Sequence, residues 1–98
     1  MKNNFDIPEN VIKEIASHAE NCGIEKVILF GSRARGTNGE RSDIDLAVTG
    51  GDFSEFCFAV DEQVNTLLMF DVVDLNSCKS AELISEIERD GVVLYEKI

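Results

Sequence analysis

The sequence predicts an α/β or α+β fold, in which helices pack against a β-sheet. Segments with the apolar spacing of amphipathic helices alternate along the chain with short segments that have the spacing of strands. The chain has 98 residues, of which 44% are hydrophobic and 29% charged, so it can bury one modest core. We therefore expect one domain over residues 1–98.

The first part of the chain is expected to form a helix and then a buried strand. Residues 8–22 have helical spacing, with Pro8 suited to the first turn and Gly23 to the position after the end. The apolar stripe of this helix is Val11, Ile12, Ile15, Ala16 and Ala19. Residues 27–30 are continuously apolar, which favours a buried strand. The polar residues 37–42 are expected to form a loop.

Residues 43–49 are expected to form the second strand, because polar and apolar residues alternate at its start. This period places Asp43 and Asp45 together on one face of the strand. A helix should follow, with Asp52 as its N-cap and Glu55 at the third helical position. The apolar stripe expected for this helix is Phe56, Val60, Val64 and Leu67.

The last part of the chain is expected to add a strand, a helix and a final strand. Residues 70–75 and 92–95 have strand character, and residues 80–90 should form a helix that stops at Gly91. The side chains that this helix should turn inward are Leu83, Ile84 and Ile87. A short helix after the first strand completes the order α-β-α-β-α-β-α-β.

Charge and targeting patterns narrow the classes of function. The formal net charge is −10, and free nucleic acid is a poor partner for such a chain because backbone binding needs clustered Lys and Arg. An acidic surface would suit a basic protein partner. The N-terminus lacks the apolar stretch of a signal peptide, and no apolar run could span a bilayer, so we expect a cytoplasmic protein without a membrane role. Three separated cysteines suit neither a disulfide framework nor a zinc site.

The motif that can carry chemistry is Gly31-Ser32 followed, ten residues later, by Asp43-x-Asp45. A glycine directly after a buried strand lets the backbone turn sharply and approach a ligand closely. A helix that opens there would direct free N–H groups towards an anion, and the Ser32 hydroxyl could donate to a phosphate oxygen. The first half of the motif therefore predicts a turn that binds phosphate.

The second half of the motif predicts a site for a hard divalent cation. The carboxylates of Asp43 and Asp45 project side by side and repel each other unless a cation lies between them. Mg²⁺ prefers oxygen ligands and is usually held by one or two carboxylates plus substrate phosphates. A third carboxylate on a neighbouring strand, Asp71 or Asp74, would allow two ions, which stabilise both oxygens of a phosphoryl displacement.

Segments 29–36 and 42–48 resemble the DNA polymerase beta nucleotidyltransferase superfamily. More narrowly, they resemble the minimal nucleotidyltransferases that serve as antitoxins to HEPN toxins (the MntA-like group). The resemblance runs from the first helix to the final strand and implies a mixed β-sheet flanked by helices. It also implies that ATP is the substrate and that two Mg²⁺ ions assist. Gly31 and Ser32 match the residues that hold the triphosphate.

Further roles follow from the same resemblance. Asp43 and Asp45 match the two metal-binding catalytic carboxylates. The third carboxylate aligns best with Asp71, with Asp74 as the alternative on the opposite face of its strand. The basic pair that follows Gly-Ser in the family is matched by Arg33 and Arg35. One of these arginines would contact phosphate or balance the carboxylates, and the alternative for each is an ordinary surface charge.

The activity implied by the resemblance is transfer of AMP from ATP to a hydroxyl, expected to be a tyrosine, on a partner HEPN toxin. Larger relatives have extra domains for the acceptor, so here the partner is expected to shape the acceptor site. One alternative is a non-catalytic antitoxin that neutralises its toxin by binding alone, although a pure binder has no need of clustered carboxylates. The other is a nucleotidyltransferase for a small molecule such as an aminoglycoside.

Overall fold

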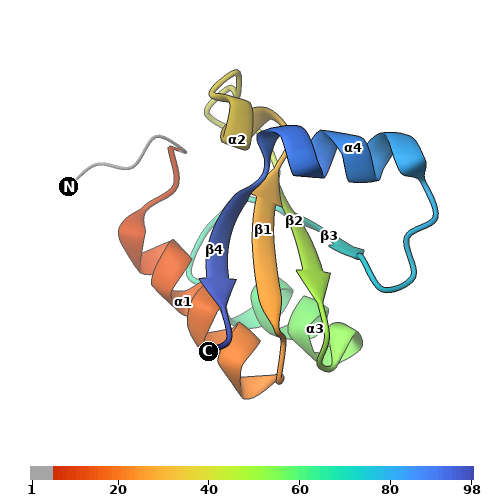
Figure 1. Cartoon of the computed structure of the whole chain (residues 1–98). Helices are drawn as coiled ribbons and strands as arrows, with labels where there is room; N and C mark the ends of the chain where they lie inside the picture. Colours follow the sequence, from red (N-terminus) through yellow and green to blue (C-terminus); the bar gives the residue numbers. More distant parts are fainter. Residues whose placement is uncertain (1–5) are drawn as a thin grey trace.

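A computed structural model describes residues 6–98, and within them it has the predicted order of helices and strands (Figure 1). The elements are α1 (Glu9–Asn21), β1 (Lys26–Phe30), α2 (Ser32–Arg35), β2 (Ile44–Thr49), α3 (Phe53–Gln63), β3 (Phe70–Asp74), α4 (Ala81–Asp90) and β4 (Val92–Glu96). No helix among these residues is long and apolar enough to cross a membrane.

The four strands form one mixed sheet in the order β3-β2-β1-β4. Strand β1 pairs with both β2 and β4 in antiparallel fashion, whereas β2 and β3 are parallel. Parallel neighbours need a crossover connection, and α3 supplies it between β2 and β3. The predicted fold class, a small mixed sheet flanked by helices, is therefore confirmed.

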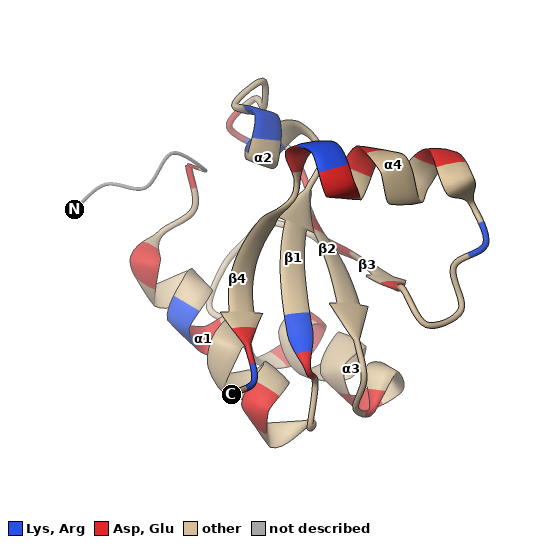
Figure 2. Cartoon of the chain, viewed as in Figure 1, with Lys and Arg blue, Asp and Glu red and all other residues tan. Residues whose placement is uncertain are grey.

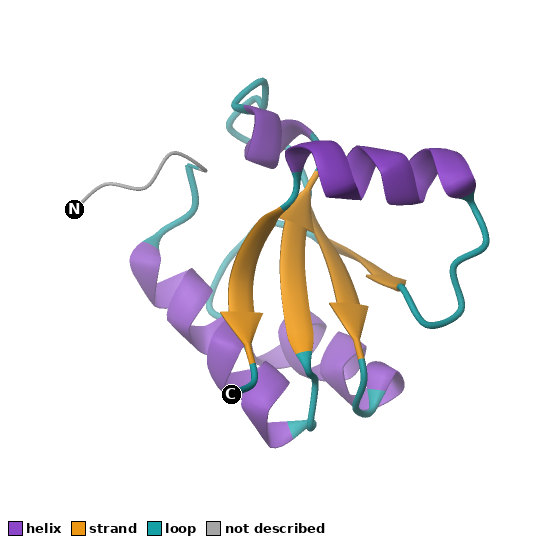
Figure 3. Cartoon of the chain, in the orientation of Figure 1, coloured by secondary structure: helices purple, strands orange, loops and turns teal. Residues whose placement is uncertain are grey.

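Helices cover the two faces of the sheet unequally (Figure 3). Helices α1 and α3 pack together on one face, and the larger core lies between them and the sheet. The shorter α4 crosses the other face near the end of β1 where α2 begins (Figure 1). A small apolar cluster around Phe30, Ala47 and Ile87 fixes α4 in that place.

Helices α3 and α4 start with the side-chain caps that their sequences favour. Asp52 Oδ1 accepts a hydrogen bond from the Glu55 backbone N–H at 3.1 Å, as predicted for the start of α3. Ser80 Oγ accepts from the Leu83 N–H at 3.2 Å and caps α4 in the same way. These caps fix where the helices begin relative to the strand before each of them.

One part of the predicted core is wrong. The stripe proposed for the third helix ended at Leu67, but α3 ends at Gln63, and the Leu67 side chain is fully exposed. Val64 adopts an extended conformation, with φ −86° and ψ 131°, which takes the chain out of the helix. The chain must turn there to reach the start of β3, so the helical period no longer applies after Val64.

Candidate active site

The site begins where β1 ends, at Gly31. Its backbone has φ 77° and ψ −156°, a region that is open in practice only to glycine. A Cβ atom added to Gly31 would collide with the carboxylate of Asp45 on the neighbouring strand. Glycine is therefore required twice here, once by the backbone conformation and once by the close approach of Asp45. The sequence motif correctly indicated a sharp turn, and the structure adds the side chain against which it turns.

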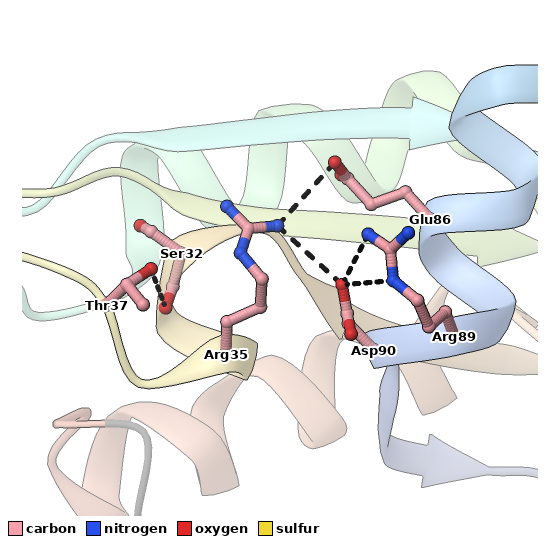
Figure 4. Close-up of polar contacts among 6 residues, drawn as sticks. All are labelled: Ser32, Arg35, Thr37, Glu86, Arg89 and Asp90. Carbon is pink, nitrogen blue, oxygen red and sulfur yellow. Dashed lines mark hydrogen bonds and ion pairs between the residues drawn. The ribbon is translucent and has the colours of Figure 1, made fainter.

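The residues after Gly31 form the single-turn helix α2, which ends at Gly36 in a left-handed conformation with φ 79°. The Ser32 carbonyl accepts from the Thr37 N–H at 2.9 Å and from the Thr37 hydroxyl at 3.5 Å (Figure 4). The Ser32 side chain is half-buried. This turn follows β1 directly and brings Ser32 to the same end of the sheet as Asp45.

The strand register settles which carboxylates lie together. Phe30 pairs with Asp45 across β1 and β2, and Asp45 pairs with Asp71 across β2 and β3. Paired residues on neighbouring strands present their side chains to the same face. This is the face of α4, because Ala47, two residues beyond Asp45 on β2, packs in the cluster beneath that helix. Asp45 and Asp71 are therefore neighbours at the end of the sheet where Gly31 lies.

Asp74, the alternative third carboxylate, lies elsewhere. It pairs with Val48, so its side chain points to the opposite face of the sheet. Its carboxylate accepts hydrogen bonds from the Asn76 N–H at 3.0 Å and from the Ser77 hydroxyl at 3.3 Å. Asp74 therefore stabilises the turn after β3 and is not brought to the other carboxylates.

Charge repulsion is concentrated on Asp45. Its pKa is raised from 3.8 to about 6, chiefly by burial and then by the negative charges of Asp71, Asp43 and Glu86. The cation of Arg35 acts in the opposite direction. Asp43 itself is exposed and directly precedes β2. A partly buried carboxylate surrounded by three others is stabilised by any cation that binds among them.

The chemistry of these residues fits an open Mg²⁺ site. Among the described residues, no three carboxylate, histidine or cysteine side chains form a ready-made metal cage. Mg²⁺ does not require one, because it usually keeps several waters and takes one or two carboxylates with substrate phosphates. Asp45, with Asp71 beside it and Asp43 preceding its strand, supplies ligands of the right kind at a position open to a triphosphate.

Arg33 does not occupy the position predicted for it. Its side chain is 1% exposed, and its guanidinium donates to backbone carbonyls at Ser42, Glu40 and Asp6. Two of the roles considered for Arg33, a phosphate contact and an ordinary surface charge, need an exposed guanidinium. The buried geometry contradicts both expectations, because all three guanidinium nitrogens donate to the protein backbone.

Arg35 remains at the surface, and its guanidinium reaches across to α4 (Figure 4). Its Nη1 lies 3.6 Å from Glu86 Oε1 and 3.9 Å from Asp90 Oδ2. Exposed ion pairs of this kind contribute little to stability, so Arg35 could leave them for a phosphate at small cost. In Figure 2 the basic residues of α2 lie beside α4, which is mostly acidic.

Glu86 is a member of this cluster that the sequence did not indicate. It lies in the middle of α4, more than forty positions from the Gly-Ser and Asp-x-Asp motifs, within a helix that carries several other acidic residues. Only the packing of α4 over the end of β1 brings it near Arg35 and Asp45. No local signal in the sequence separates it from the solvent-exposed Glu82 and Glu88.

A glycine-dependent turn that faces paired aspartates at one end of a mixed sheet agrees with the nucleotidyltransferase class that the sequence motif indicated. Residues 10–98 match the model of the family described as polymerase beta, nucleotidyltransferase. The chain therefore belongs to the polymerase beta nucleotidyltransferase family, and it is a nucleotidyltransferase.

Individual relatives agree with this family. A protein of Methanocaldococcus jannaschii named "putative protein adenylyltransferase" is 40% identical over 81 residues, which cover 74% of this chain and 79% of the relative. A chain of a toxin–antitoxin crystal structure with AMP-PNP has a TM-score of 0.69 and 25% identity, covering 88% of this chain and 73% of that one.

Two further solved structures share the fold. A chain of the Y104A mutant of the toxin–antitoxin pair MntA–HpeT has a TM-score of 0.65 and 27% identity, covering 93% of this chain and 74% of that one. A chain of a complex between tri-AMPylated Shewanella oneidensis HEPN toxin and its MNT antitoxin has a TM-score of 0.62, covering 89% of this chain and 71% of that one. Its identity is 22%, so it supports the fold alone.

Proposed function

We propose that this chain is the antitoxin of a toxin–antitoxin pair and transfers AMP from ATP to a hydroxyl group, expected to be a tyrosine, of a cytoplasmic HEPN toxin. The observation that carries the proposal is the pairing of Asp45 with Asp71 directly beside Gly31. The relative named as a protein adenylyltransferase supports the choice of AMP and of a protein acceptor. The toxin–antitoxin structures with the same fold support the choice of partner.

In the proposed reaction, the acceptor oxygen attacks the α-phosphorus of ATP, the bond to the β-phosphate bridging oxygen breaks, and pyrophosphate leaves. Mg²⁺, when bound, neutralises the triphosphate and the charge that develops on it. The backbone turn at Gly31 and the Ser32 hydroxyl hold the phosphates, and Asp43 and Asp45 hold the metal beside them. Asp71 also binds metal and accepts the proton of the attacking hydroxyl. Most of the acceleration then comes from positioning and charge stabilisation.

The charge of the chain agrees with a protein acceptor. The formal net charge of −10 gives a largely acidic surface, to which a basic protein partner is attracted. Acidic residues are spread over α1, α3 and α4, whereas the exposed cation of α2, beside the site, is Arg35 (Figure 2).

The test is transfer of label from ATP to the purified partner toxin in the presence of Mg²⁺. Wild type should label the toxin, whereas Asp45→Asn and Asp71→Asn should not, since each removes a charge from the metal site. Asp43→Asn should fail for the same reason. Asp74→Asn is the matched control, because Asp74 lies in the same strand as Asp71 but on the other face and should leave labelling intact.

Different results would select a different function. A toxin that is silenced without label, by wild type and by all four variants, would identify a binding antitoxin and exclude transfer as the mechanism. Label on an aminoglycoside with none on the toxin would identify a small-molecule enzyme. Equal labelling by wild type and Asp71→Asn would exclude the role given to Asp71.

A further inference from the structure

Arg33 is the only charged side chain that is fully buried within the described part of the chain. It extends from α2, the helix that follows Gly31, into the protein and not towards the site opening. Its Nη1 donates to the Asp6 carbonyl at 2.7 Å, in the segment that leads into α1. Its Nη2 donates to the Glu40 carbonyl at 3.2 Å. One side chain therefore connects three separate stretches of backbone.

Two of the Arg33 hydrogen bonds end next to the proposed metal site. Ser42 O accepts from Arg33 Nε at 3.1 Å and from Nη2 at 2.9 Å, which is a forked contact from one guanidinium edge. Ser42 directly precedes Asp43, and Asp43 lies just outside strand β2. The peptide that carries Asp43 is therefore held on its N-terminal side by a side chain.

The loop has few other anchors at this point. Two hydrogen bonds join Gly39 and Ser42, from the Gly39 N–H to Ser42 Oγ at 2.9 Å and from the Ser42 N–H to the Gly39 carbonyl at 3.2 Å. The Asn38 side chain donates to the Gly39 carbonyl at 3.1 Å and to Asp6 Oδ2 at 3.5 Å. These bonds shape the turn but do not tie it to the sheet. Ladder bonding resumes only at Ile44, whose N–H donates to the Met69 carbonyl at 2.9 Å.

We infer that Arg33 is a positioning residue, which holds the Ser42 carbonyl so that the Asp43 carboxylate lies on the same side of the sheet as Asp45. The inference rests on the proposed function insofar as Asp43 is a metal ligand. An arginine suits this task because its planar guanidinium presents donors in a fixed fork, whereas a lysine ammonium is a single point that cannot reach all three carbonyls.

The same contacts link the segment before α1 to the site. Because Asp6 and Ser42 bind the same guanidinium, a shift of one backbone segment changes the support of the other. Arg33 thus follows Gly31 and Ser32 directly in the sequence, but we infer that it supports the metal site by positioning Asp43. Residues that orient metal ligands typically change metal affinity about 10-fold to 100-fold when they are mutated.

The experiment compares Arg33→Lys with a control of equal stability loss. Val60→Ala removes buried apolar volume from α3, in the main core and on the other face of the sheet, without touching the loop. The first readout is amide hydrogen exchange over residues 39–44 in the metal-free chain. The second is the Mg²⁺ concentration that gives half-maximal AMP transfer to the partner toxin.

If the inference is right, Arg33→Lys accelerates exchange over residues 39–44 and raises the half-maximal Mg²⁺ concentration by roughly 10-fold. Val60→Ala should change neither quantity at a matched melting temperature. Equal behaviour of the two variants in both readouts would overturn the inference, since Arg33 would then contribute only stability. Faster exchange with an unchanged Mg²⁺ requirement would also overturn it, because the loop would be loosened without effect on Asp43.

The inference can still be tested if a variant does not fold or if wild type transfers no AMP. Should Arg33→Lys not fold, Arg33→Gln, which keeps a donor amide and removes the buried charge, replaces it. Failure of both variants to fold would make Arg33 a determinant of the whole fold and reject the specific role. If wild type transfers no AMP, the proposed function is wrong, and exchange over residues 39–44 still decides whether Arg33 holds the segment.

Discussion

Asp45 should destabilise the metal-free protein at neutral pH, so Asp45→Asn should make it more stable while it abolishes activity. The folded structure raises the pKa of Asp45 from 3.8 to about 6, with burial as the main cause and the neighbouring carboxylates next. Asparagine has nearly the same shape as the protonated carboxyl group. It therefore removes the repulsion and still fits against Gly31, where the Asp45 carboxylate lies.

The magnitude follows from the size of this pKa change. A difference of about 2 pH units corresponds to roughly 3 kcal/mol as an upper limit, at about 1.4 kcal/mol per unit. Asp45 is only partly buried, so solvent screening reduces this to about 1 kcal/mol. For a domain of this size, ~1 kcal/mol shifts the melting temperature by about 4–8 °C. We expect an increase of that order at pH 7 without metal.

The pH dependence gives the decisive comparison. A raised folded-state pKa means that the contribution of Asp45 to stability is fully present below pH 3.8 and is lost as the pH rises through about 6. The gap between Asp45→Asn and wild type should therefore be largest at pH 7 and nearly absent at pH 4. Thermal unfolding followed by circular dichroism, with Asp74→Asn as the control, measures this gap. A gap of the same size at both pH values, or a destabilised variant at pH 7, would refute the reasoning.

Three further predictions concern the same site. Gly31→Ala should lower the free energy of unfolding by more than Gly36→Ala, because both glycines have positive φ but only Gly31 faces the Asp45 carboxylate. Urea unfolding should show a cost of about 1–2 kcal/mol at Gly36 and a larger one at Gly31. Equal costs would contradict the close approach of Asp45 to Gly31. Glu86→Gln should lower the pKa of Asp45, since it removes one of the negative charges that raise that pKa. Carboxyl NMR titration measures the pKa, and the control Glu88→Gln, at an exposed position of the same helix, should leave it unchanged. EDTA should stop AMP transfer and leave the far-UV circular dichroism unchanged, because the two apolar clusters hold the fold without metal. Loss of helical signal on chelation would instead show that the metal is structural.

The sequence predicted the order of elements because each was marked locally. The capping residues of α3, the apolar stripe of α1 and the continuous apolar strand before Gly31 all act within a few positions. Leu67 was assigned wrongly for the same reason, since a stripe continued by spacing alone contains no signal that the helix has ended. The end of α3 is set by the crossover to β3, which is a tertiary requirement.

The site was predictable only as far as its motifs are local. The choice between Asp71 and Asp74 depended on the pairing of β3 with β2, which alternation in one strand cannot reveal. Arg33 and Arg35 are two positions apart in the same short helix, yet one is buried among carbonyls and the other reaches α4. Sequence patterns give the presence of charge, whereas burial and partners depend on segments that are distant in the chain.

The separation of core and site over two faces of one sheet explains how this small domain can hold clustered carboxylates. The main core lies under α1 and α3 and contains no charged side chain, whereas the face with Asp45 carries α4 and a small apolar cluster. On the proposed function, the repulsion left at Asp45 in the free protein is relieved when metal and ATP bind. A ligand at 100 times its Kd adds about 2.7 kcal/mol to folding stability, more than the ~1 kcal/mol expected from Asp45. The arrangement that weakens the free protein therefore gives the nucleotide and its metal part of their binding free energy, and the core on the opposite face does not have to rearrange.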